Sequence, residues 1–318
     1  MRICPLCGTT THVRICPVCG TPTVLDTQEF ISDEEEPAGV IDHYMLIKEL
    51  GEGGMGKVFL AKDIRKSRKV ALKLINPRKI NDPHAVTRAR RGVLACASLN
   101  HPNIVEVYDF KVLENGEWLI AMRYINGTPL DQLIRKHGRF KPSAVMYLLE
   151  KLADALNYAH NKGVVHRDIK PSNIILERDS SGRIQPVITD FEVAKWFGSI
   201  DNQTDPTQKG FLIGTPSYMS PEQIMSSGEV DGRSDIYSLG VVTYEMLTGI
   251  NPFRRPDTID TIKAQLHIAP PPLPEEVKRE LPPPFVMLLF RMLAKDRDRR
   301  IQSGKSIVKA LKAMSSMV

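Results

Sequence analysis

A glycine-rich stretch of the chain has the residue types that a phosphate-binding loop needs. It reads Gly51-Glu52-Gly53-Gly54-Met55-Gly56-Lys57-Val58 and stands between two predicted strands. Glycine lets the backbone approach a phosphate closely, so that N–H groups can bind the oxygens without obstruction by side chains. A GxGxxG pattern also occurs in dinucleotide-binding folds, but those place a helix after the glycines. Because a strand follows here, we expect a strand–loop–strand cover over phosphate groups.

A lysine in the next predicted strand could supply a cation for the same ligand. Lys73 lies inside the apolar run Val70–Ile75, and burial of an ammonium group is costly unless an anion meets it. The alternative is a lysine on an edge strand whose head group extends into solvent. The position of Lys73 shortly after the glycine loop favours a phosphate partner.

The most specific stretch of the chain lies further along. It reads His166-Arg167-Asp168-Ile169-Lys170-Pro171-Ser172-Asn173, and Asp190-Phe191-Glu192 follows 22 residues after Asp168. The order of these motifs is far more specific than any one of them alone. Later motifs, in order, are Gly214–Glu222 (GTPSYMSPE), Asp235–Gly240 (DIYSLG) and Arg300.

Together these motifs resemble those of the protein kinases, over about residues 44–314. Lys170, two residues after Asp168, and the GTPSYMSPE stretch resemble the corresponding motifs of serine/threonine kinases rather than those of tyrosine kinases. The nearest likeness is to the eukaryotic-like serine/threonine kinases of bacteria. The resemblance implies an α+β fold with a small β-rich lobe and a large helical lobe.

The resemblance also implies a role for individual residues. Lys73 would pair the α- and β-phosphates of ATP, and Asp168 would accept the proton of the substrate hydroxyl. Lys170 would neutralise the transferring γ-phosphate, while Asn173 and Asp190 would hold magnesium. The other positions implied to contact ATP are Gly51, Glu52, Gly53, Gly54, Met55, Gly56, Val58, Ala71, the gatekeeper Met122, Arg123, Tyr124 and Ile125.

Three further residues are implied to be structural. Glu222 and Arg300 would form a buried pair in the helical lobe. Asp235 would brace the backbone of the catalytic loop. None of the three is expected to contact the reacting groups.

Two positions depart from the family's pattern. The family has a glutamate in the single small-lobe helix, paired with the strand lysine, and counting back from Asn100-His101-Pro102 places it at Gly92. The glycine of the DFG motif is replaced by Glu192, which resists backbone conformations that glycine permits. We hypothesise that Glu192 or Asp190 replaces the missing carboxylate beside Lys73. The alternative is that both changes impair activity.

The segment between Asp190 and Glu222 contains hydroxyl residues that a kinase could modify. Arg167, next to the catalytic aspartate, offers a cation for a phosphate group on this segment. The candidate phosphosites are Thr204 and Thr207, where we expect autophosphorylation. The alternative is an ordinary polar loop.

Four of the five cysteines form two similar pairs. Cys4-Pro5-Leu6-Cys7-Gly8 is echoed by Cys16-Pro17-Val18-Cys19-Gly20. Two CxxC knuckles suit tetrahedral coordination of zinc by thiolates, and the glycine after each pair permits the turn. Residues 1–20 therefore resemble a zinc ribbon whose fold the metal would stabilise. Two disulfides or free thiols are the alternative, which a reducing compartment disfavours.

The rest of the chain supplies the elements that position these residues. Residues 21–40 contain Asp33-Glu34-Glu35-Glu36-Pro37 without apolar periodicity, which predicts an acidic linker. A small sheet with one helix, at about Pro83–Ser98, is expected from residue 41 to about 125. Its expected strands are Tyr44–Leu50, Lys57–Ala61, Val70–Ile75, Ile104–Phe110 and Trp118–Tyr124.

The chain from about residue 126 to 318 is predicted to be mostly helical. One apolar stripe at helical spacing marks a buried face, and further helices are expected over Asp231–Gly249, Phe285–Ala294 and Gly304–Met314. A β-rich part followed by an α-rich part implies an α+β architecture in two lobes. The stripe consists of Val145, Leu148, Leu149, Leu152, Leu156 and Ala159.

The composition is that of a globular protein with enough apolar residues for a full core. Apolar residues make up 42% of the chain and charged residues 25%, with 43 basic and 37 acidic side chains. The net charge of +6 comes without a long Lys/Arg run, so no nucleic-acid partner is favoured. Because there is no apolar leader and no run of about 18 apolar residues, we expect no membrane span and a cytoplasmic setting.

The sequence supports three functional hypotheses. The first is an active serine/threonine kinase that uses ATP and magnesium on protein substrates. The second is a pseudokinase scaffold that binds nucleotide or partners without turnover, which Gly92 and Glu192 favour and the intact catalytic residues oppose. The third is an adaptor in which the zinc ribbon binds a regulatory protein.

Overall fold

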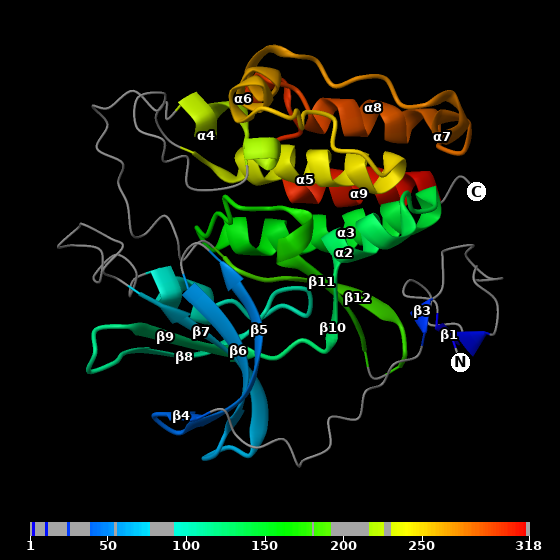
Figure 1. Ribbon diagram of the computed structural model, residues 1–318. Coiled ribbons are helices and arrows are strands. Elements are labelled where there is room, and N and C mark those ends of the chain that lie inside the picture. The colour runs from blue at the N-terminus through cyan, green and yellow to red at the C-terminus, as the bar shows by residue number, and fades with distance from the viewer. Residues whose placement is uncertain are drawn as a thin grey trace. The chain divides into compact units, whose positions relative to one another are not determined.

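The computed structural model describes residues 2–3, 10–11, 24–25, 39–53, 56–76, 92–179, 181–191, 216–225 and 230–315. The chain divides into two compact units (Figure 1). The small unit includes the described residues between 39 and 126. The large unit includes those from 127 onward.

The small unit is built around a six-stranded antiparallel sheet with the order β4-β5-β6-β7-β9-β8. Residues 92–97 are helical and carry Gly92 at their start. Four of the five expected strands are confirmed within a few residues. The strands are β4 (Gly39–Ile41), β5 (Tyr44–Gly53), β6 (Gly56–Asp63), β7 (Arg68–Ile75), β8 (Val107–Val112) and β9 (Trp118–Arg123).

The strand expected at Ile104–Phe110 begins later than predicted, at Val107. The residues before it form a turn in which the Ile104 N–H donates to the carbonyl of His101 at 3.0 Å. The His101 ring also accepts a hydrogen bond from the Asn103 N–H. Ile104 is buried. The apolar residue that suggested a strand here therefore packs the turn against the core.

Alternation along the strands separates the two faces of this sheet. One face carries a packed cluster that includes Tyr44, Leu72 and Ala121, all of them 2% exposed or less. The residues on either side of Leu72 in the strand, Ala71 and Lys73, point to the other face. The core cluster therefore fixes which side chains are left for the opposite face.

Gly56 is a position where the fold requires glycine. It begins β6, and a Cβ atom there would stand 1.8 Å from the carbonyl oxygen of Leu74 on β7. Backbone cannot move aside as a flexible side chain can. Gly51, in β5, has nothing within 4 Å of its Cβ position. The glycines of the loop therefore differ, and only some of them are needed for the sheet itself.

The large unit is mostly helical, with a small sheet of order β10-β11-β12 (Figure 1). The strands are β10 (Gly127–Pro129), β11 (Ile174–Arg178) and β12 (Ile184–Ile188). The helices are α2 (Leu130–His137), α3 (Pro142–Asn161), α4 (Pro221–Met225), α5 (Gly232–Thr248), α6 (Thr258–His267), α7 (Glu275–Arg279), α8 (Pro283–Met292) and α9 (Gly304–Ser315).

Helices α3 and α5 form the centre of the large unit. The predicted apolar stripe of α3 is confirmed, since all six of its residues are fully buried. Helix α5 is buried nearly all round; Asp231 caps its start by accepting from the Arg233 N–H, and Gly249 ends it in the left-handed conformation with φ 77°. Helix α5 thus has capped ends, and both helices have a buried surface, which makes them a rigid base for the loops beside them.

Three short strands precede the small unit. Strand β1 (Arg2–Ile3) pairs antiparallel with both β2 (Thr10–Thr11) and β3 (Val24–Leu25). The four paired cysteines lie outside the described residues. In the part of the chain that the structure describes, no helix has both the length and the apolar character needed to cross a bilayer.

Candidate functional site

Strand register brings several predicted ATP-binding residues to one face of the small-unit sheet. Lys73 on β7 pairs with Val58 on β6 and with Ile120 on β9. Two residues away, Ala71 pairs with Met122. Directly paired residues, and residues two apart on one strand, share a face. Val58, Ala71, Lys73 and Met122 therefore lie together, on the face opposite the core cluster.

Lys73 is half-buried on this face. Ala71 and Met122 beside it are 9% and 8% exposed. An ammonium group in such apolar surroundings is stabilised by an anionic partner. The glycine loop joins β5 to β6 beside this face, because Gly51 on β5 pairs with Val58 on β6.

The chain leaves β9 through the residues implied to meet the adenine. Arg123 ends the strand, and its N–H donates to the carbonyl of Glu106 at 2.8 Å. Tyr124 and Ile125 follow, and Ile125 is buried. Gly54 and Met55, at the tip of the glycine loop, lie outside the described residues.

The helical residues 92–97 contain no acidic side chain, and Gly92 is buried. A buried glycine offers no side chain where the family has its glutamate. Glycine within a helix also costs about 1 kcal/mol relative to alanine. The carboxylate that accompanies the strand lysine in the family is therefore missing from this part of the helix.

In the large unit, the catalytic-loop sequence is organised by His166. Its ring is fully buried, with Nε2 2.9 Å from the carbonyl oxygen of Thr189. Its Nδ1 accepts a hydrogen bond from the Asp168 N–H at 3.2 Å. Both contacts are satisfied when the ring carries its proton on Nε2. The ring of Phe191 lies 4.6 Å from that of His166, so this histidine links the loop to the Asp190-Phe191 stretch.

Asp168 is held by two neighbours from its own loop. The Nζ atom of Lys170 lies 2.7 Å from Asp168 Oδ2, and Asn173 Nδ2 donates to the same oxygen at 3.0 Å. Asn173 Nδ2 also donates to the main-chain carbonyl of Asp168 at 2.9 Å. The carboxylate is therefore fixed through one oxygen. No described residue donates to the other, Oδ1, and the side chain is 39% exposed.

Asp190 follows a strand end that is tied to the same loop. The N–H and hydroxyl of Thr189 both donate to the carbonyl of Asn173, at 2.9 and 3.2 Å. Asp190 itself has a positive φ of 56°, a conformation that non-glycine residues adopt only when their surroundings require it. The two implied magnesium ligands are thus brought to adjoining positions in the large unit.

The brace predicted for Asp235 is confirmed. Its carboxylate is fully buried and accepts from the backbone N–H groups of His166 and Arg167, at 2.8 and 2.6 Å. His160 Nε2 lies 2.7 Å from the same carboxylate. Burial alone would raise the pKa of Asp235, but the hydrogen bond from His160 and the charges nearby lower it overall. Asp235 therefore stays ionised and holds Arg167 at its positive φ of 62°.

The buried pair predicted for Glu222 and Arg300 is also confirmed. The two guanidinium nitrogens of Arg300 lie 2.6 and 2.7 Å from the two carboxylate oxygens of Glu222. Ser234 donates to Glu222 at 2.6 Å. Burial raises the pKa of Glu222, yet the bonds from Arg300 outweigh this and hold it below its ordinary range.

Sequence reasoning missed two residues that support the loop. His160 contacts Asp235 from helix α3, and Gln223 Nε2 donates to the carbonyl of Arg167 at 2.7 Å. Both contacts join residues more than fifty positions apart. Such distant partners leave no pattern in the local sequence. Only a comparison with the family at each position could have identified them.

The donor set of the large unit fits a hard divalent cation. Asn173 is 5% exposed, and its amide nitrogen is fully used by Asp168. Its amide oxygen accepts no hydrogen bond from any described residue. Carboxylate and amide oxygens are the ligands that magnesium prefers. Asn173 and Asp190 are therefore suited to hold this ion.

Several predicted residues cannot be placed in this geometry. Glu192, Thr204 and Thr207 lie outside the described residues. Their implied roles remain predictions from the sequence. Cys4, Cys7, Cys16 and Cys19, implied to bind zinc, also lie outside the described residues.

Comparison with known proteins extends over most of the chain. The protein kinase domain matches residues 44–313. The serine/threonine-protein kinase pkn3 of Myxococcus xanthus is 34% identical over 290 residues, which is 91% of this chain and 52% of the relative. The serine/threonine-protein kinase PknB of Mycolicibacterium smegmatis is 36% identical over 273 residues, covering 84% of this chain and 42% of the relative.

The same family is found among solved structures. The kinase domain of Mycobacterium tuberculosis PknI matches with a TM-score of 0.67 and 27% identity, covering 88% of this chain and 99% of that one. The chain spans about half the length, or less, of the curated relatives named above. The strand-rich small unit, the helical large unit and the matched residues together show that this chain belongs to the protein kinase family.

Proposed function

We propose that this chain is a serine/threonine protein kinase, which transfers the γ-phosphoryl group of ATP to hydroxyl groups of proteins. One observation carries the proposal: Asp168 is fixed through Oδ2 by Lys170 and Asn173. The names of the relatives support the same hydroxyl specificity. Protein substrates are the corresponding partners.

The fixed carboxylate suits the role of base. With Oδ2 engaged at 2.7 and 3.0 Å, Oδ1 of Asp168 is the atom that would take the proton of the attacking hydroxyl. Lys170, whose side chain is 21% exposed and whose Nζ lies 2.7 Å from Oδ2, places a cation beside the base, where it would neutralise the charge of the transferring γ-phosphate. Positioning and charge neutralisation account for most of the rate in this chemistry.

Each unit has residues suited to one part of the magnesium–nucleotide complex. Lys73 and the residues on its sheet face, with the glycine loop and Arg123–Ile125, would hold ATP. Asn173 and Asp190 would hold magnesium, which when bound supplies neutralisation of the phosphate charge. The chain's own contribution is to keep these groups in place before the substrate arrives.

The hydroxyl class is tested by phosphoamino-acid analysis. Incubation of the full chain with magnesium and radiolabelled ATP should place phosphate on serine and threonine of a mixed protein acceptor. Peptide mapping of the chain itself should find phosphate at Thr204 or Thr207. Label found only on tyrosine would contradict the proposed specificity, and an unmodified 192–215 segment would contradict autophosphorylation there.

A pseudokinase is the second candidate, and the buried Gly92 is the observation that favours it. Without a carboxylate on the helix, Lys73 would need another partner to remain oriented. We propose that Glu192 or Asp190 takes this place. Unchanged ATP affinity and turnover in Glu192→Ala would exclude Glu192 as that partner.

We further propose that residues 1–20 form a zinc ribbon, joined by a linker at 21–40 to a kinase domain at 41–318. The two CxxC pairs support it, as does their position in sequence between the paired strands β1, β2 and β3. A regulatory protein is the partner that such a ribbon would suit.

Metal analysis tests the ribbon. The purified chain should contain about one zinc per molecule, as one site with four thiolate ligands requires. Cys16→Ser should lose most of that zinc, while Cys96→Ala, a change at a buried thiol outside the pairs, should keep it. Equal zinc content in the two variants would exclude the site.

A further inference from the structure

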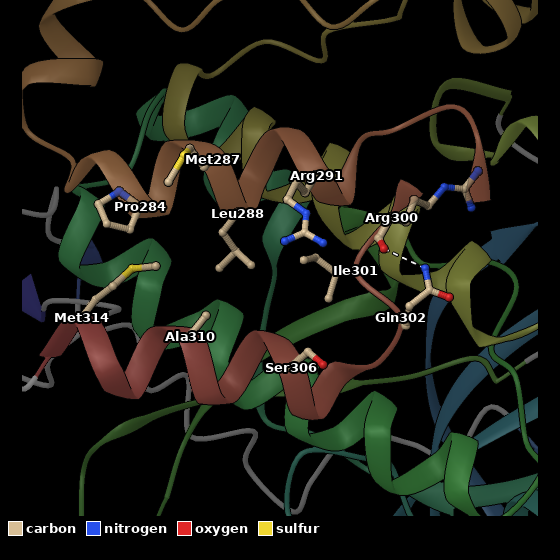
Figure 2. Close-up of a pocket in the computed structure, with 10 residues that line it drawn as sticks. All are labelled: Pro284, Met287, Leu288, Arg291, Arg300, Ile301, Gln302, Ser306, Ala310 and Met314. Carbon is tan, nitrogen blue, oxygen red and sulfur yellow. Dashed lines mark hydrogen bonds between the residues drawn. The ribbon is translucent and has the colours of Figure 1, made fainter. Parts of the chain in front are cut away.

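A cavity of about 480 Å³ lies between helices α8 and α9, on the large unit and apart from the residues implied in phosphoryl transfer. Its size is in the range of small-molecule sites. Figure 2 shows that the two helices line it from opposite sides. The lining residues are Pro284, Met287, Leu288, Arg291, Arg300, Ile301, Gln302, Ser306, Ala310 and Met314.

The lining is a consequence of helical spacing. On α8 the lining residues fall at positions i, i+3, i+4 and i+7, from Pro284 to Arg291, and so form one face. On α9 they fall at i, i+4 and i+8, from Ser306 to Met314. With a rise of about 1.5 Å per residue, each stripe is about 10–12 Å long. The cavity is therefore an elongated trough.

The two ends of the trough differ in chemistry. Figure 2 shows Pro284, Met287 and Met314 at one end, and Arg291 and Ser306 at the other. Met287 is 64% exposed, although methionine side chains are usually covered by other apolar groups. An exposed, adaptable thioether at the mouth of an apolar trough suits contact with a ligand.

The polar end offers one cation whose partner is missing among the described residues. Arg300 is used by Glu222, and Gln302 donates to the carbonyl of Arg300 at 2.7 Å. Ser306 shares a hydrogen bond with Ser303. Arg291 makes no ion pair or hydrogen bond within the described part of the chain. Figure 2 shows its guanidinium extending from α8 into the space above α9.

The two helices that line the trough carry charge of one sign. Neither α8 nor α9 contains an acidic residue, whereas α9 carries Lys305, Lys309 and Lys312. The nearby acidic side chains have partners of their own, since Asp298 pairs with Arg233 at 2.7 Å and Asp296 with an arginine of its own turn. A ligand with a negative head is therefore favoured at this end.

We propose that this trough binds a single-chain carboxylate, such as a medium-chain fatty acid. The carboxylate would meet Arg291, whose planar fork matches two carboxylate oxygens. The hydrocarbon chain would lie along Leu288 and Ala310 toward Met287 and Met314. The ligand thus matches both the length of the trough and its division into a charged and an apolar end.

Titration of the full chain with decanoate, below its micelle threshold, tests the proposal. Calorimetry should show one saturable site, and methyl resonances of Met287 and Met314 should shift in ¹³C-methionine spectra. Decanol, which has the same chain without the charge, should bind more weakly. Arg291→Gln should weaken decanoate binding by about five- to tenfold, the loss of about 1 kcal/mol or more, and leave decanol binding unchanged.

Three variants complete the test. Lys312→Gln, which removes a charge of the same sign outside the lining, should leave decanoate binding intact. Ala310→Trp should abolish binding of both ligands by filling the trough. If Ala310→Trp does not fold, Met287→Glu takes its place: this change at an exposed position should abolish decanoate binding by putting an acidic group at the apolar end of the trough. Absence of saturable binding, or binding that neither Arg291→Gln nor Met287→Glu alters, would overturn the proposal.

Discussion

Replacing Arg300 with methionine should lower the free energy of unfolding of the large unit by about 3–5 kcal/mol, because it leaves a buried carboxylate without its partner. Arg300 is 1% exposed, and all five of its N–H donors are used. Besides the two bonds to Glu222, it donates to the main-chain carbonyls of Arg233, Ala294 and Lys295. The side chain thus ties α4 to the start of α5 and to the segment after α8.

Urea unfolding with hydrogen exchange as a local probe measures this effect. Exchange should rise in α4, α5 and residues 294–300 of Arg300→Met. The double variant Glu222→Leu with Arg300→Met should lose less than the sum of the single changes, because it removes both charges. Glu275→Gln, at an exposed pair with Lys278, serves as the control and should stay within about 0.5 kcal/mol of the original chain. An Arg300→Met variant as stable as that control would contradict this account.

Local patterns predicted the elements whose apolar residues repeat regularly. The stripe from Val145 to Ala159 marked α3, because burial on one face of a helix sets the spacing of its apolar residues. The apolar run Val70–Ile75 marked β7. Because side chains alternate along a strand, Lys73 shares a face with Ala71. Register then brought Val58 and Met122 to that face, a step that depends on which strands pair.

Other elements had weaker signals. Helix α6 was not predicted, although Asp257 is a regular N-cap that accepts from two backbone N–H groups. Its buried face contains Thr261 and Gln265, polar residues that hide the apolar stripe. Gln265 is satisfied by Tyr237 and by the carbonyl of Pro216. Such partners lie far away in sequence, and local periodicity does not reveal them.

The candidate site was predicted as a set of residues, and the structure adds how they are held. The resemblance implied a base at Asp168 and a brace at Asp235. It did not indicate that Lys170 and Asn173 share one oxygen of Asp168, or that His160 helps Asp235 to stay ionised. These contacts depend on side-chain conformation within a folded loop, which residue type and spacing do not determine.

Replacing Asp168 with asparagine should reduce phosphoryl transfer by about 10²–10⁴-fold, the usual contribution of a positioned base. The amide cannot take the hydroxyl proton: its oxygen can still accept from Lys170 and Asn173, now 2.7 and 3.0 Å from Oδ2, but its NH₂ group then stands where Oδ1 would accept the proton. The brace through Asp235 and the anchor through Thr189 are untouched. Nucleotide affinity and thermal stability should therefore stay close to those of the original chain.

The matched control is Asp260→Asn, which removes a carboxylate from an exposed pair with Lys263 on α6. It should retain full activity. Loss of activity in Asp260→Asn equal to that in Asp168→Asn would point to a general charge effect in place of a catalytic one.

The most direct measurement compares the initial rate of phosphate incorporation into serine and threonine by the original chain and by Asp168→Asn, under equal magnesium, ATP and acceptor. An active kinase predicts a ratio of at least about 10², with nucleotide bound equally by both proteins. Equal nucleotide binding with equal, background-level incorporation would show instead that the chain binds ATP without transferring its phosphate, and would contradict the proposed function.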